Sequence, residues 1–321
     1  MNNHNNKILL SIRCFVYNHE PYLRQCLEGF VMQNTNFAFE AIVHDDASTD
    51  NSAAIIREYA EKFPDIIKPI YETKNLYSRH DGSLQRAVDD AISSSSKYIA
   101  ICEGDDYWTD PLKLQKQVDF LESHPDYGLV YTNYKNYFQE NGTTTISNCI
   151  QTSFEDEIIR NRIATLTTLV RGSLWKQYVQ DIGNTPYERK WLMGDYPIWI
   201  YILANSKAKL ISDVTAVYRV LKNSASHHTS YKKSMDFLLS TYDITFFFAD
   251  KYNVSTEIRK TIANNEINDM LYLTKKHNTN LHFPLFKFMV SNEVFNIKKY
   301  ISALLRSSVW GRTIYNHIKA I

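Results

Sequence analysis

The stretch "KYIAICEGDD", residues 97–106, runs an apolar, strand-like segment directly into three carboxylates. The apolar residues 98–101 suit a buried strand, and Asp105 and Asp106 follow at its end. Adjacent carboxylates repel each other unless a cation or hydrogen-bond donors compensate their charge. For an isolated Asp-Asp pair a solvated turn that caps a helix is the commoner interpretation. The surrounding sequence therefore has to decide whether this Asp-Asp pair caps a helix in a solvated turn or binds a cation.

Strand-like and helix-like segments alternate through the first 130 residues. Strands are expected at residues 8–17, 39–46, 66–72, 97–104 and 127–134. Apolar residues with helical spacing mark the segments between them, as at Leu23, Leu27 and Phe30. This alternation predicts an α/β fold, in which a mixed, mostly parallel sheet has helices on both faces. From about residue 140 we expect shorter, less regular elements, and beyond Tyr231 a C-terminal helical extension.

Polar clusters follow each of the first four expected strands. They are "NHE" (18–20), "DDASTD" (45–50), "ETKN" (72–75) and "EGDD" (103–106). Open α/β sheets bind ligands outside the carboxyl ends of their strands, so these clusters should meet at one edge. Mg²⁺ and Mn²⁺ take oxygen ligands, commonly one or two carboxylates plus substrate phosphates. Two Asp-Asp pairs at neighbouring strand ends thus favour a site for a divalent cation and a phosphorylated ligand.

The composition limits the possible partners and the compartment. Lys and Arg number 36 and Asp and Glu 35, for a formal net charge of +1, which offers no overall field for nucleic acid. The four cysteines show no CxxC spacing, which indicates reduced thiols. The N-terminal "MNNHNNK" lacks the apolar segment of a signal peptide, and no apolar stretch is long enough to span a bilayer. We expect a cytoplasmic protein with no nucleic-acid partner.

Two domains are expected, a catalytic domain over 1–230 and a helical region over 231–321. In residues 281–321 Phe, Leu and Ile alternate with Lys and Arg, a composition that suits a helix lying on an anionic membrane. Packing of these helices on the catalytic domain is the alternative. Peripheral contact with the inner membrane surface is thus one of two open expectations.

Five stretches occur in the order and spacing of one known family across residues 7–230. They are "SIRCFVYNHEPYLRQCLEGFVMQ" (11–33), "FEAIVHDDASTDNSAAIIREYA" (39–60), "KYIAICEGDDYWTDPLKLQKQVDFL" (97–121), "MGDYPIWIYI" (193–202) and "VYRVLKNSASH" (217–227). In these stretches the chain resembles the inverting family 2 glycosyltransferases. The resemblance implies the GT-A nucleotide-diphospho-sugar transferase fold.

The resemblance also implies a donor site. Asp46 would accept the N3–H of the base, which favours uracil, and backbone around Phe15 and Tyr17 would complete the base pocket. Asp105 would contact the ribose. Asp106 would bind the Mn²⁺ or Mg²⁺ that bridges the diphosphate and offsets the charge of the departing nucleoside diphosphate.

The catalytic base is expected further along the chain. Asp195 falls where the family places its catalytic carboxylate, which takes a proton from the acceptor hydroxyl. Without the resemblance, Asp195 would be read as a helix cap. Arg219, or Lys222 nearby, would pair with phosphate. His227 would be a further metal ligand or a phosphate donor, and sequence does not rank it against His228.

Two departures from the family pattern affect this donor site. Ala47 stands where the family usually has Gly, and the stretch "ETKNLYSRHDG" (72–82) replaces the commoner Asn-x-Gly form. The second departure removes the basis for assigning phosphate contacts to Asn75 and Arg79.

The function expected from these features is inverting hexosyl transfer that depends on a divalent metal. The donor would be a nucleotide sugar, favoured as UDP-linked, and the acceptor a hydroxyl of a glycan or lipid-linked glycan in surface polysaccharide biosynthesis. A sugar nucleotidyltransferase would need a Gly-rich, basic loop after the first strand, which "VYNHEPYL" (16–23) lacks. A non-catalytic nucleotide-sugar-binding scaffold remains an alternative, disfavoured by the retained carboxylates. A dehydrogenase is disfavoured because no G-x-G-x-x-G follows a strand.

Overall fold

The computed structural model describes residues 7–222, 230–280, 297–308 and 310–312. The chain divides into two compact units, each described by itself. The first comprises Met1–Phe154, Arg162–Lys190 and Ile198–Leu221, and the second Glu155–Asn161, Trp191–Pro197 and Lys222–Ile321. Two short segments upstream of residue 230 thus group with the second unit. The division into domains at residue 230 stays a prediction.

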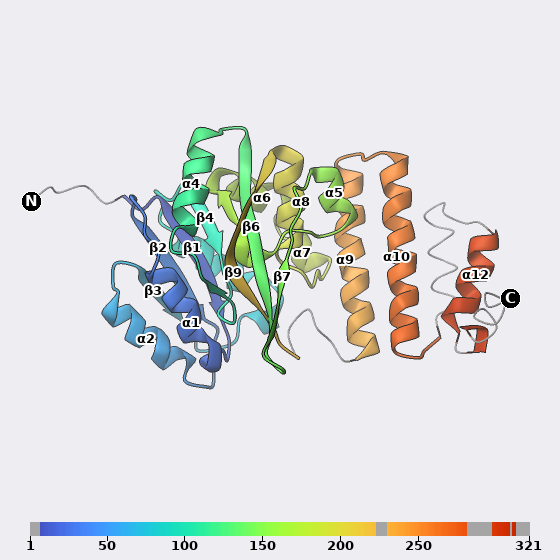
Figure 1. The fold of residues 1–321 in the computed structure, drawn as a ribbon, viewed down its shortest axis with the longest axis horizontal. Helices are drawn as coiled ribbons and strands as arrows, with labels where there is room; N and C mark the ends of the chain where they lie inside the picture. The colour runs from blue at the N-terminus through green and yellow to red at the C-terminus, as the bar shows by residue number, and fades with distance from the viewer. Residues whose placement is uncertain (1–6, 223–229, 281–296, 309, 313–321) are drawn as a thin grey trace, which may run out of the picture. The chain divides into compact units, whose positions relative to one another are not determined.

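Nine strands of the described residues form one sheet in the first unit (Figure 1). They are β1 (Leu10–Val16), β2 (Phe39–Asp45), β3 (Ile67–Tyr71), β4 (Tyr98–Ile101), β5 (Tyr107–Trp108), β6 (Tyr127–Phe138), β7 (Thr143–Ser147), β8 (Leu169–Arg171) and β9 (Lys207–Val220). Their order is β3-β2-β1-β4-β8-β6-β9-β5, with β7 paired to β6.

The sheet is parallel where the sequence predicts alternating strands and helices. β3, β2, β1 and β4 pair in parallel, as do β6 and β9, whereas β8, β5 and β7 pair antiparallel to their neighbours. The predicted α/β fold with a mixed sheet is confirmed. The expectation of shorter, less regular elements from about residue 140 is wrong for β9, a strand of 14 residues. The sequence of β9 mixes polar and apolar residues because much of this strand is only partly buried.

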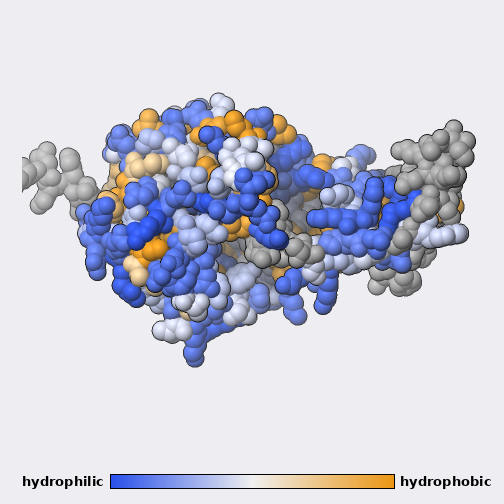
Figure 2. Space-filling view, turned by 60° about the horizontal axis from the view of Figure 1, so that its bottom comes forward, coloured by the Kyte–Doolittle hydropathy of each residue, from blue (hydrophilic) through white to orange (hydrophobic). Residues whose placement is uncertain are grey.

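Helices cover both faces of this sheet. Those of the first unit are α1 (Glu20–Val31), α2 (Ser52–Lys62), η1 (Tyr77–Arg79), α3 (Ser83–Ala91), α4 (Lys113–Ser123), η2 (Thr165–Thr167), α6 (Gly172–Ile182) and α7 (Thr185–Glu188). Alternate residues of β1, Leu10, Ile12 and Cys14, are buried in one apolar cluster with α1, α2 and α4. On the opposite face Arg13 forms an ion pair with Asp89 of α3, 3.0 Å between Nη2 and Oδ1. The face drawn in Figure 2 is mostly hydrophilic, with apolar side chains in small groups.

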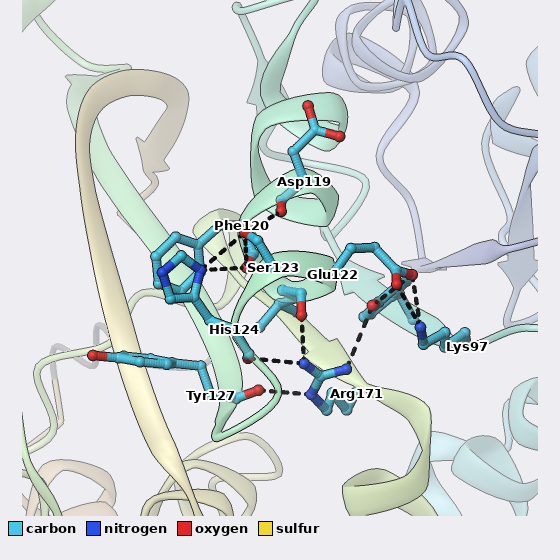
Figure 3. Close-up of polar contacts among 10 residues, drawn as sticks. Lys97, Asp119, Phe120, Glu122, Ser123, His124, Tyr127 and Arg171 are labelled. Carbon is cyan, nitrogen blue, oxygen red and sulfur yellow. Dashed lines mark hydrogen bonds and ion pairs between the residues drawn. The ribbon is translucent and has the colours of Figure 1, made fainter.

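Arg171, the last residue of β8, fixes the end of α4 (Figure 3). Its Nε donates to the carbonyl oxygen of Tyr127 at 2.7 Å, and its Nη2 donates to those of Leu121 at 2.6 Å and His124 at 3.0 Å. The last carbonyl groups of a helix lack partners within the helix, so a guanidinium there supplies the missing donors. Arg171 thereby joins β8 to the turn between α4 and β6.

The second unit is helical. Its elements are α5 (Phe154–Ile159), the start of α8 (Tyr196–Asn205), α9 (Tyr231–Lys251), α10 (Thr256–Lys276) and α12 (Ile297–Ser307). Met235, Ile267, Met270 and Ala303 contribute to one apolar cluster that joins α9, α10 and α12. Among the residues described, no helix has the length and apolar character needed to cross a membrane.

Candidate active site

The turns that follow β2 and β4 are both attached to the end of β1. The N–H of Asp46 donates to the carbonyl oxygen of Val16 at 2.9 Å, and the N–H of Gly104 donates to that of Phe15 at 3.0 Å. Consecutive residues of one strand therefore hold the two acidic turns. The structure brings "DDAS" and "EGDD" to the same edge of the sheet, as expected for carboxyl ends of parallel strands.

Side chains lock the turn after β1 to the turn after β2. The N–H of Asn18 donates to Oγ of Ser48 at 2.9 Å, and the N–H of Thr49 donates to Oδ1 of Asn18 at 2.8 Å. The N–H of Glu20 donates to Oδ2 of Asp50 at 3.0 Å. The polar residues of "NHE" and "STD" thus hold this edge of the sheet in shape.

Ala47 adopts a left-handed backbone conformation, with φ of 61°. Glycine enters this region without the steric cost that a Cβ brings, which accounts for the glycine that the family usually has at this position. The departure at Ala47 therefore retains the turn geometry at some cost in backbone energy.

Asp46 is buried, and its carboxylate holds the loop after β3. Its Oδ1 accepts from the N–H of Leu76 at 2.6 Å, and its Oδ2 accepts from the N–H of Tyr77 at 3.0 Å. The side-chain amide of Asn75 donates to the carbonyl oxygen of Asp46 at 3.2 Å. Each carboxylate oxygen has a second lone pair, so acceptance of a base N–H stays a prediction for Asp46.

Phe15 and Tyr17, expected beside the base, lie at the end of β1. The carbonyl of Phe15 accepts from Gly104, and its ring meets His44 edge to face, 6.0 Å between centroids. Tyr17 is 47% exposed. A base pocket around this backbone stays a prediction.

Asp106 is a buried carboxyl, 5% exposed, in the turn after β4. Its Oδ1 accepts from the backbone N–H of Arg219 at 2.7 Å. Burial raises the pKa of Asp106 well above its usual range, the charge of Asp105 raises it further, and the N–H of Arg219 opposes the shift. A divalent cation would favour the ionised form, so the donor chemistry here fits Mg²⁺ or Mn²⁺. Over the described ranges, no group of three or more His, Cys, Asp or Glu side chains is placed to hold a metal ion.

The guanidinium of Arg219 makes hydrogen bonds to this acidic turn and to two glutamine side chains. It is buried, and its Nε donates to the carbonyl oxygen of Asp105 at 2.9 Å. Its Nη1 donates to Gln139 Oε1 at 2.7 Å and its Nη2 to Gln25 Oε1 at 2.6 Å. Three rings lie around its Cζ: Tyr22 at 4.7 Å, Tyr107 at 5.4 Å and Tyr137 at 5.5 Å. Arg219 thus positions the acidic turn, and its pairing with phosphate stays a prediction.

Gly104 and His19 form a close contact that sequence reasoning missed. A Cβ added at Gly104 would lie 2.7 Å from Nδ1 of His19 and 3.3 Å from the carbonyl oxygen of Phe15. Only glycine therefore lets the imidazole pack on the acidic turn. Burial lowers the pKa of His19, against the raising effects of Asp105 and Asp50. The histidine in "NHE" was a signal, but its contact partner is 85 positions away in sequence.

Asp195, the expected base, belongs to the second unit and directly precedes α8. Its Oδ1 accepts from the N–H of Tyr196 at 2.8 Å. The N-terminus of a helix favours negative charge, because its first N–H groups and its dipole face that end. His227 and His228 lie outside the described residues, so their predicted roles remain predictions.

Fold and site together define the class: a GT-A type domain, with a parallel half-sheet and acidic turns at its carboxyl edge. The model for glycosyl transferase family 2 matches residues 11–228. The chain belongs to this family, which confirms the resemblance seen in the sequence.

Three comparisons place the chain among known proteins. The uncharacterized protein Rv1520 of Mycobacterium tuberculosis is 45% identical over 118 residues, 36% of this chain and 32% of the relative. The matched region spans about a third of that relative's length. A structure of S. aureus TarS 1-349 with UDP-GlcNAc has TM-score 0.63 at 15% identity, covering 98% of this chain and 92% of that one. The mannosyltransferase PcManGT from Pyrobaculum calidifontis with GDP-Man and Mn²⁺ has TM-score 0.56 at 14% identity, covering 98% and 87%. The two structures share the fold of this chain.

Proposed function

We propose that this family 2 glycosyltransferase transfers a hexose from a UDP-linked donor to a hydroxyl of a glycan, with inversion at the anomeric carbon. The observation that carries the proposal is the attachment of both acidic turns to Val16 and Phe15 at the end of β1. It brings Asp46 and the Asp105–Asp106 pair to the edge where open α/β sheets bind ligands.

The donor's base would bind beside Asp46, with backbone around Phe15 and Tyr17. The ribose would contact Asp105. The TarS structure contains UDP-GlcNAc and the PcManGT structure contains GDP-Man, so a nucleotide-sugar donor is supported and the uracil preference needs its own test.

Asp106 would hold Mn²⁺ or Mg²⁺, with His227 as a second protein ligand. Such a cation, when bound, offsets the charge that develops on the departing nucleoside diphosphate. The backbone N–H of Arg219 orients the Asp106 carboxylate, and its guanidinium keeps the turn in place.

Asp195 would act as the general base. Its carboxylate takes the proton of the acceptor hydroxyl while that oxygen attacks the anomeric carbon. The new bond joins acceptor oxygen to sugar, and the bond between sugar and diphosphate breaks on the opposite side. The N-terminus of α8 directly follows this carboxylate, and the N–H of Tyr196 donates to its Oδ1.

The acceptor would be a glycan or lipid-linked glycan of a surface polysaccharide pathway at the cytoplasmic side of the inner membrane. The basic and apolar C-terminal sequence supports peripheral contact with anionic lipid. Sedimentation with anionic liposomes tests this point. We expect the intact chain to pellet and a chain truncated after Asn280 to stay in the supernatant, whereas equal partitioning would remove the membrane role.

Donor identity is tested by thermal shift with a panel of nucleotide sugars, each with and without Mn²⁺. We expect UDP sugars to raise Tm only with the metal. A shift with GDP-mannose alone would indicate that the donor carries guanine in place of uracil. No shift with any donor would contradict the proposed nucleotide-sugar site, whereas a shift without any release of nucleoside diphosphate would favour a non-catalytic nucleotide-sugar-binding scaffold.

A further inference from the structure

Trp191 begins the loop 191–195, which ends at Asp195, and its indole makes a hydrogen bond to α9. The Nε1 of Trp191 donates to Oδ2 of Asp243 at 2.7 Å. The ring is buried and packs against Phe247 and Phe248, with centroids 5.3 Å and 6.1 Å away. One residue therefore joins the loop to α9 by both a polar contact and an apolar one.

The next two residues of the loop also bond to α9. The N–H of Leu192 donates to Oγ of Ser240 at 2.8 Å. The hydroxyl of Thr241 donates to Sδ of Met193 at 3.4 Å. Ser240 and Asp243 are three residues apart, so they lie on one side of the helix. Three consecutive loop residues thus bond to a single turn of α9.

On the other side of Asp195, Tyr196 is anchored to α5. Its side chain is buried, and its hydroxyl donates to the carbonyl oxygen of Glu157 at 2.7 Å. Asp195 is therefore held between two anchors, α9 before it and α5 after it.

α9 begins at Tyr231, beyond the segment 11–228 that matches the family. We propose that α9 is nevertheless part of the catalytic machinery, with Asp243 as a positioning residue that sets the Asp195 carboxylate through Trp191. This inference rests on the proposed role of Asp195 as base. A misplacement of about 1 Å in a reacting group lowers rate by up to about 100-fold, so loss of the anchor should appear mainly in kcat.

The test uses three variants that differ in one hydrogen bond. Trp191→Phe keeps an aromatic ring but removes the N–H donor, Asp243→Ala removes the acceptor, and Asp243→Asn retains an acceptor oxygen while removing the charge. Asp250→Asn, on the exposed end of α9 beside Arg259, serves as a control. All four are compared by release of nucleoside diphosphate, with water as acceptor, from the donor that gives the largest thermal shift.

We expect Trp191→Phe and Asp243→Ala to lower kcat by about 10-fold to 100-fold, with donor Kd within about twofold of wild type. Asp243→Asn and Asp250→Asn should stay within about threefold. Hydrogen exchange of residues 191–196 should speed up only in the first two. Full kcat in Trp191→Phe, or an equal loss in Asp243→Asn, would overturn the proposal.

Asp195→Asn separates this inference from the proposed function. If that variant releases nucleoside diphosphate at the wild-type rate, the base assignment fails, and the positioning role fails with it. If Asp195→Asn is inactive while Trp191→Phe is fully active, only the positioning role of α9 fails. A loss of donor affinity as large as the loss of kcat in Asp243→Ala would indicate general disruption and also overturn the inference.

Discussion

The backbone N–H of Arg219 donates to Oδ1 of Asp106 at 2.7 Å, which joins the end of β9 to the acidic turn after β4. The same residue's guanidinium donates to the carbonyl oxygen of Asp105. Arg219 therefore ties the edge of the sheet directly to the proposed cation ligand, Asp106.

Asp106→Asn should raise the stability of the metal-free protein and abolish metal binding at this turn. In metal-free buffer at neutral pH we expect a higher Tm, because burial raises the pKa of Asp106 and the amide carries no charge to desolvate. The amide oxygen can still accept from Arg219. The added Tm shift that Mn²⁺ and UDP give the wild type should disappear. Asp126→Asn, at an exposed ion pair with Lys207, should keep that shift; a full shift in Asp106→Asn would exclude Asp106 as the ligand.

Arg219→Lys should destabilise the protein although it keeps the positive charge. Lysine cannot reproduce the fork that reaches Gln25, Gln139 and Asp105, so its ammonium group would lie at a buried position with fewer acceptors. We expect the free energy of unfolding to fall by about 2–4 kcal/mol in urea denaturation. Arg24→Lys is the matched control, since solvent screens the exposed ion pair of Arg24 with Glu58 and its loss should change stability little. If the free energy of unfolding fell as little in Arg219→Lys as in Arg24→Lys, the hydrogen bonds of the Arg219 guanidinium would contribute little to stability.

Asp195→Asn should abolish transfer and leave donor binding nearly intact. The amide keeps the acceptor oxygen for the N–H of Tyr196 but cannot take a proton. General-base catalysis typically contributes about 100-fold to 10,000-fold, so kcat should fall by at least about 100-fold. Calorimetric titration with UDP and Mn²⁺ should give a Kd within about twofold of wild type. An active Asp195→Asn would assign the base to another residue.

Glu266 in α10 should make stability fall as pH rises. It is 3% exposed, and burial raises its pKa to about 8, with the charge of Asp269 adding to the shift. Between the unfolded value of 4.5 and about 8, the native state binds more protons than the unfolded state. The free energy of unfolding therefore decreases with pH across that window, by up to about 1.4 kcal/mol per unit.

Glu266→Gln removes this titration. Its Tm relative to wild type should rise between pH 5 and pH 8 and change little above about pH 8. Glu257→Gln, at an exposed position in the first turn of the same helix, controls for the loss of a charge from α10. A constant Tm difference for Glu266→Gln across that range would contradict the raised pKa.

The parallel half of the sheet was predictable from sequence, because the apolar pattern that marks a strand is visible within a few consecutive residues. Leu10, Ile12 and Cys14 alternate toward one face, and polar clusters mark the strand ends. The role of β9 was not predictable in this way, since its partner β6 lies about 80 residues earlier and both strands are only partly buried.

Some residues around the acidic turn after β4 were predictable from sequence, and others were not. Asp46, Asp105 and Asp106 were candidates because carboxylates at strand ends are unusual without a ligand. Gln25 and Gln139 gave no signal, since they meet Arg219 from 194 and 80 residues away. The hydrogen bonds between the Asp195 loop and α9 were not predictable from sequence either. Helical spacing shows which side of a helix is apolar, but not which loop makes hydrogen bonds to that helix.

The pairing of Arg219 with Asp106 also orders events during synthesis of the chain. Asp106 is made 113 residues before Arg219, which at about 5–20 residues per second leaves roughly ten seconds between them. Through that interval the nascent chain holds the acidic turn after β4 without the strand that orients Asp106. The proposed cation and nucleotide site should therefore be complete only once β9 has left the ribosome and paired with β6.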